Sequence, residues 1–99
     1  MRPYAGYSIN FEAFWKYYRG ATRVDYSGYR ATFVKCFCES EAKYGLSEGY
    51  GSDHVNAVDK RLAPICSQTR VLMLSKGVPD AAIKHITTHF KKWFKSYYA

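Results

Sequence analysis

A pair of histidines is the first feature of the sequence that could support chemistry. His85 and His89 lie four residues apart, so a helix would place both imidazoles on one face, as a zinc site requires. The segment reads HITTH and therefore lacks the glutamate base of the HExxH motif. A third ligand would have to come from His54, a cysteine or a distant carboxylate. We expect surface or packing histidines, and we predict no bound metal and no cofactor.

Nucleophilic catalysis would depend on the cysteines Cys36, Cys38 and Cys66, whose odd number and irregular spacing do not fit a disulfide framework. On a helix, residues two apart point roughly 200° away from each other, so Cys36 and Cys38 cannot share a metal ion. Cys66 lies at a possible helix start, where the helix dipole would lower the pKa of its thiol. No sequence signature places a base or an oxyanion site beside it. The sequence therefore predicts inert, reduced thiols in a cytoplasmic protein without catalytic residues.

The histidines belong to residues 80–98, for which the sequence predicts a long amphipathic C-terminal helix. At about 100° per residue, its large apolar side chains fall within an arc of roughly 100°. Lysines form a stripe beside this arc, and the histidines flank its other edge. We expect the arc to pack on aromatic residues nearer the N-terminus. Its members are Ile83, Ile86, Phe90, Trp93, Phe94 and Tyr97.

The remaining sequence predicts four further helices, which makes about five in a single all-α domain spanning residues 1–99. Capping residues and helical spacing of apolar side chains mark their limits. The chain has 99 residues and an aromatic content of 18%, enough for a small aromatic-rich core. The expected ranges are Ser8 or Asn10 to a terminal Gly20, then 27–44, 52–62 and 67–76.

The bond between Ala63 and Pro64 is expected to lie in a turn, because proline interrupts the interior of a helix. Such a turn would form a rigid corner between two aliphatic helices. Exposed there, Pro64 could alternatively contact a prolyl isomerase or another partner.

The positive charge of the chain is concentrated in its second half. The formal net charge is +7, and residues 51–99 carry eight Lys/Arg against three Asp/Glu, a net of +5. This imbalance favours an anionic partner, although a lysine-rich face can also serve only to keep a protein in solution. No segment approaches the roughly 18 apolar residues needed to span a bilayer, so we expect no membrane association.

Residues 72–86, LMLSKGVPDAAIKHI, resemble a helix-turn-helix motif. Gly77 would make the turn, and Val78 would pack into the elbow. Met73 departs from the motif, which favours a small residue where the two helices cross. An ordinary corner between helices needs the same glycine and buried aliphatic residues, so both interpretations stay open. In the DNA-binding interpretation, the residues facing outwards towards a major groove would be Ala81, Lys84, His85 and Thr88.

Three hypotheses for function follow. The first is a small, basic, non-enzymatic adaptor or inhibitor that docks on a larger host or cellular protein of nucleic-acid metabolism, a character typical of small phage-encoded host-modulating proteins. The second is direct DNA binding through the corner formed by residues 67–92. The third is a metal- or thiol-dependent enzyme using His85, His89 or Cys66. For the first two, the candidate binding residues are Arg70, Lys76, Lys84, His85, Thr88, Lys91, Lys92 and Lys95.

Overall fold

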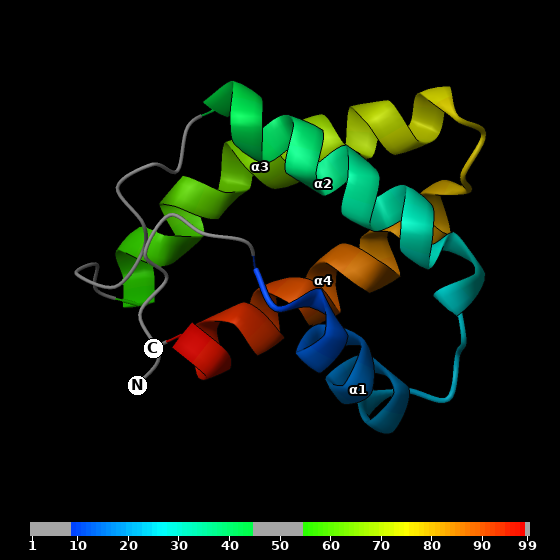
Figure 1. The fold of residues 1–99 in the computed structure, drawn as a ribbon, viewed down its shortest axis with the longest axis horizontal. Coiled ribbons are helices and arrows are strands. Elements are labelled where there is room, and N and C mark those ends of the chain that lie inside the picture. Colours follow the sequence, from blue (N-terminus) through cyan, green and yellow to red (C-terminus); the bar gives the residue numbers. More distant parts are fainter. Residues whose placement is uncertain (1–8, 45–54, 99) are drawn as a thin grey trace.

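The computed structural model describes residues 9–44 and 55–98, and within these ranges all of the regular structure is helical (Figure 1). The prediction of an all-α fold is confirmed. Four α-helices and one short 3₁₀ turn replace the five expected helices in these ranges. None of the helices described is long and apolar enough to cross a membrane. In chain order the elements are α1 (Phe11–Ala21), η1 (Ser27–Tyr29), α2 (Arg30–Tyr44), α3 (Val55–Ser75) and α4 (Asp80–Tyr98).

Helix α1 begins as the sequence predicts and ends later. The Asn10 side chain caps it by accepting a hydrogen bond from the backbone N–H of Ala13, at 3.1 Å, which satisfies a donor that the helix leaves unpaired. The prediction that Gly20 ends the helix is wrong. Gly20 lies inside α1, which continues to Ala21, and it has no positive φ.

Helix α3 corrects the prediction of a turn at Pro64. The two helices expected over 52–62 and 67–76 are one continuous helix, with Pro64 in its interior. The Pro64 side chain is exposed, but it lies on a helix and not in a turn. The turn was predicted because proline is disfavoured in the interior of a helix. In the structure, buried side chains on both sides of Pro64, at Leu62, Ile65 and Cys66, hold this part of the helix against the core.

The corner between α3 and α4 follows the sequence closely. Gly77 has a φ of 84°, a left-handed conformation that glycine adopts without steric cost. Its N–H donates to the Leu74 carbonyl at 3.0 Å, and the N–H of Val78 donates to the Met73 carbonyl at 3.1 Å. These two bonds form a Schellman motif, with the buried side chains of Val78 and Met73 beneath it. Val78 packs inward as predicted.

The helices pack in two pairs, α1 with α4 and α2 with α3, and α2 crosses α3 (Figure 1). Helices α1 and α4 run in opposite directions, with Asn10 Nδ2 donating to the Tyr97 hydroxyl at 3.2 Å near one end. Helices α2 and α3 form the other pair. The hydroxyl oxygens of Ser40 and Thr69 lie 3.2 Å apart between them, and each hydroxyl also bonds to a carbonyl of its own helix. Both hydroxyls are buried, and these contacts satisfy them.

An aromatic core joins the two pairs. Phe90 of α4 lies at its centre, with ring centroids 5.1 Å from Phe14 of α1 and 4.7 Å from Phe37 of α2. Both separations lie in the range of attractive ring contacts. The predicted apolar arc of α4 is buried, apart from a half-buried Tyr97. The buried members are Ile83, Ile86, Phe90, Trp93 and Phe94.

Candidate functional site

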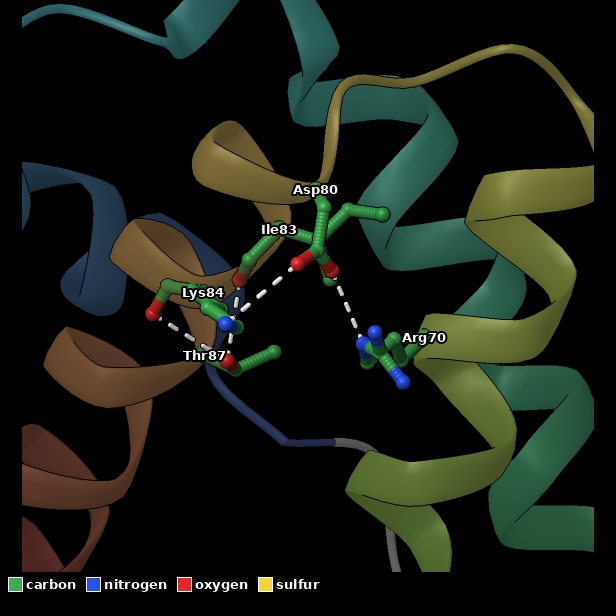
Figure 2. A network of polar contacts seen from close by, with 5 residues as sticks. All are labelled: Arg70, Asp80, Ile83, Lys84 and Thr87. Atoms are coloured by element: carbon green, nitrogen blue, oxygen red, sulfur yellow. Dashed lines mark hydrogen bonds and ion pairs between the residues drawn. The ribbon is translucent and has the colours of Figure 1, made fainter.

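A polar network at the corner connects the start of α4 to α3 (Figure 2). Asp80 lies in the first turn of α4, where the helix dipole favours a negative charge. Its carboxylate accepts a hydrogen bond from Arg70 Nε at 2.8 Å and lies 3.4 Å from Lys84 Nζ. The hydrogen bond from Arg70 and the nearby positive charges hold the pKa of Asp80 below its usual value. The network therefore stays ionised at neutral pH and spans both helices of the corner.

This network changes how two of the predicted binding residues can act. Arg70 and Lys84 both share the charge of Asp80, so neither is an isolated cation. Both side chains nevertheless remain largely exposed, at 49% and 71%. A partner can therefore contact them without disturbing the core.

The other candidate residues on α4 lie on the same side of the helix as Lys84. Thr88 and Lys92 are exposed, whereas Lys91 and Lys95 are half-buried. Lys76, directly after α3, is exposed beside Gly77. The structure thus brings seven of the eight predicted residues to the outer side of the corner and along α4. The exception is His85.

His85 faces α1 rather than the solvent, so its expected outward orientation is wrong. Its Nδ1 lies 2.8 Å from the Tyr18 hydroxyl, and its Nε2 lies 3.1 Å from Thr22 Oγ1. The ring of Tyr26 also packs against it, with centroids 5.3 Å apart. The sequence pattern did not predict this contact, because Tyr18 and Thr22 lie more than 60 residues away from His85. The spacing of residues within α4 does not show which other helix packs against it.

The histidine pair is adjacent in space, and His54, considered as a third ligand from the sequence, lies outside the described residues. The rings of His85 and His89 have centroids 4.5 Å apart. However, both nitrogens of His85 contact hydroxyls, and Nδ1 of His89 donates to the His85 carbonyl at 2.8 Å. Among the described residues, no group of three or more His, Cys, Asp or Glu side chains could hold a metal ion.

The cysteines are separated and weakly acidic. Cys36 is buried and Cys38 is exposed, as the predicted helix requires. Cys66 is buried inside α3, so the expectation that it starts a helix is wrong. Burial raises the pKa of its thiol to about 11, which leaves almost no thiolate at neutral pH.

Two exposed aliphatic residues on α3 lie within one helical turn of Arg70, and neither was singled out from the sequence. Val71 and Leu74 are 55% and 40% exposed, although they belong to a run of four apolar residues, 71–74. A helix can bury only one side of four consecutive apolar residues, and Met73 occupies the buried side here. This property of helices could have predicted from the sequence that some residues of the run are exposed. We define the corner surface as Arg70, Val71, Leu74, Lys84 and Thr88.

The chain matches no protein-family model, no curated protein and no solved structure.

Proposed function

We propose that this protein is a small, basic, non-enzymatic interaction protein that docks through its corner surface on an acidic face of a larger protein. The observation that carries the proposal is the exposure of Val71 and Leu74 on α3, next to Arg70 and one helical turn after it. Arg70 is linked through Asp80 to the exposed Lys84. Exposed aliphatic groups on a helix that also carries an exposed cation suit a protein partner, because such a partner can bury the apolar groups and pair with the cation.

The chemistry of the described side chains supports a binding role over catalysis. Both nitrogens of His85 are occupied by hydroxyls, and burial raises the pKa of the Cys66 thiol to about 11. Neither group is arranged as a nucleophile beside a base. The net charge of +7 favours a partner with an acidic surface. A protein of nucleic-acid metabolism that binds small basic modulators would meet this requirement.

The test is a quantitative pull-down from the native host that compares surface variants. The native protein should recover one partner in stoichiometric amount, and the double variant Val71→Glu/Leu74→Glu should lose it. Val24→Glu is the matched control, because Val24 is similarly exposed, at 49%, and lies in the segment between α1 and α2. Equal recovery by all three proteins, or no stoichiometric partner, would contradict the proposal.

Direct DNA binding is a second candidate, and the geometry of the corner is the observation that favours it. A left-handed Gly77 and a buried Val78 join two helices by a short turn, as in a helix-turn-helix motif. Without His85, the exposed groups at the start of α4 are Ala81, Lys84 and Thr88.

The DNA-binding candidate predicts that Lys84→Ala and Lys92→Ala each weaken binding to duplex DNA. Each variant should also reduce the slope of log affinity against log salt by about one for every lost phosphate contact. Fluorescence anisotropy with labelled duplexes at low salt would measure both effects. Lys16→Ala on α1 is the control for a general loss of positive charge. Absence of binding by the native protein at low salt would exclude this candidate.

A further inference from the structure

A surface hollow lies between the start of α1 and the first half of α2, in a part of the molecule that contains none of the corner-surface residues. Its volume is about 620 Å³, within the usual range for sites that bind small organic molecules. The side chains of Phe11, Ala31 and Val34 make it apolar. Arg30 and Lys35 supply positive charge at the same hollow.

The two cations of the hollow have no acidic partner among the described residues. Neither Arg30 nor Lys35 forms an ion pair with a carboxylate there. The guanidinium of Arg30 instead lies 5.9 Å from the centroid of the Trp15 ring, a cation–π contact that orients it without neutralising its charge. Both side chains are exposed. The hollow therefore combines an apolar lining with unneutralised positive charge.

One of the residues that line the hollow, Gly28, has no side chain. A Cβ built on Gly28 would meet no atom within 4 Å. The space beside Gly28 is therefore open, and because Gly28 lines the hollow, we expect a larger side chain at this position to narrow it. This position allows the hollow to be filled without a substitution in the core.

We propose that the hollow binds an amphipathic organic anion, namely a small molecule with an aromatic or branched aliphatic body and one carboxylate or sulfonate group. The body would lie against Phe11 and Val34 and be removed from water. The anionic group would pair with Arg30 and Lys35, and guanidinium groups suit planar oxyanions. An uncharged ligand would leave both cations unused, and a bare inorganic anion would leave the apolar lining exposed. This site is separate from the corner surface, and its test does not depend on the proposed docking role.

The probe is 8-anilinonaphthalene-1-sulfonate, an aromatic sulfonate whose fluorescence rises in an apolar environment. We expect one saturable site on the native protein. The uncharged analogue N-phenyl-1-naphthylamine should bind more weakly, and inorganic phosphate should not compete. Amide chemical shifts of Ala31 and Val34 should move during the titration, which would locate the site.

Two variants test the two halves of the proposal. Lys35→Gln should weaken the binding of the sulfonate by about three- to fivefold and leave binding of the uncharged analogue unchanged. Gly28→Leu should weaken the binding of both probes by more than about tenfold, because the side chain occupies the hollow. The matched controls are Lys16→Gln and Gly20→Leu on α1, where Lys16 is exposed and a Cβ on Gly20 also meets open space.

The result can overturn the proposal in several ways. Absence of a saturable site on the native protein would do so, and so would equal binding of the charged and uncharged probes. Retention of full affinity by both Lys35→Gln and Gly28→Leu would place any bound probe elsewhere. Far-UV circular dichroism of each variant shows that the fold is retained. If Gly28→Leu does not fold, Lys35→Gln and the chemical shifts still decide the question.

Discussion

At the scale of single residues, His85 contacts a hydroxyl through each of its two ring nitrogens. Every donor meets an acceptor when the Tyr18 hydroxyl donates to Nδ1 of His85 and the Nε2–H of His85 donates to Thr22 Oγ1. The Tyr18 hydroxyl then accepts from the N–H of Tyr26, at 3.4 Å. A neutral imidazole satisfies this network, whereas an imidazolium would carry a second N–H pointing at the proton of Tyr18. The network therefore ties α4 to α1 through the uncharged form of one histidine.

We predict that the protein becomes less stable as the pH falls below about 6.5. Burial, together with the charge of His89, lowers the pKa of His85 from its usual value. The unfolded chain therefore binds a proton at a higher pH than the native protein does. The stabilisation is complete above pH 6.5 and is lost progressively as the pH falls towards the native pKa of His85.

Urea unfolding between pH 7.5 and 5 measures this effect through the change in unfolding free energy. His85→Gln should be less stable at pH 7.5 and should show a shallower slope over the same interval. Below pH 4 the carboxylates dominate, because hydrogen bonds lower the pKa of Asp25 and Asp80. A native protein whose stability does not change between pH 7.5 and 5 would contradict the prediction.

At the scale of secondary-structure elements, Gly20 and Gly77 show how backbone conformation decides the effect of a substitution. A Cβ at either position meets no atom within 4 Å, so packing does not distinguish them. Gly77 has a φ of 84°, whereas Gly20 lies within α1 without a positive φ. Alanine is strained in the first conformation and favoured over glycine in the second.

We predict opposite signs for the two alanine substitutions. Gly77→Ala should lower the free energy of unfolding by about 1–2 kcal/mol, because it strains the turn that ends α3. Gly20→Ala should raise it by about 0.5–1 kcal/mol. Thermal unfolding followed by far-UV circular dichroism would measure both changes. A neutral or stabilising Gly77→Ala would show that the Schellman turn does not constrain the corner.

Much of the element structure was predictable, because it depends on local rules. Residue type predicts the cap at Asn10 and the turn at Gly77. Helical spacing predicts the opposite orientations of Cys36 and Cys38. The break expected at Pro64 failed because tertiary packing of α3 overrides a local preference.

The candidate site was less predictable, because it depends on contacts between elements. The stripe of lysines on α4 could be read from helical periodicity. The pairing of Arg70 with Asp80 joins separate helices, and the orientation of His85 is set by residues of α1 and the segment after it. The exposure of Val71 and Leu74 was also within reach of the sequence, because a helix can bury only one side of the four consecutive apolar residues to which they belong.

At the scale of the whole molecule, a cluster of aromatic rings joins the two helix pairs, in addition to the packing of α3 on α4. Phe90 is fully buried and contacts rings from α1, α2 and its own helix. Its centroid lies 5.5 Å from Phe33 and 6.1 Å from Phe11, in addition to the closer contacts with Phe14 and Phe37. A single side chain therefore bridges three of the four helices, which predicts that the pairs unfold together.

We predict that Phe90→Ala lowers the free energy of unfolding by about 3–5 kcal/mol, because it leaves a cavity at the centre of the aromatic core. A domain of this size has about 5–15 kcal/mol of stability in total, so the variant would be only marginally folded. Phe90→Leu, which leaves a smaller cavity, should show a smaller loss. Tyr17→Ala on α1 is the control, because Tyr17 is 37% exposed and its loss should cost far less.

Urea unfolding should give coincident transitions by tryptophan fluorescence and far-UV circular dichroism in the native protein and in Phe90→Leu. Separate transitions, or a loss below about 1 kcal/mol for Phe90→Ala, would show that the two helix pairs are stabilised independently of this ring.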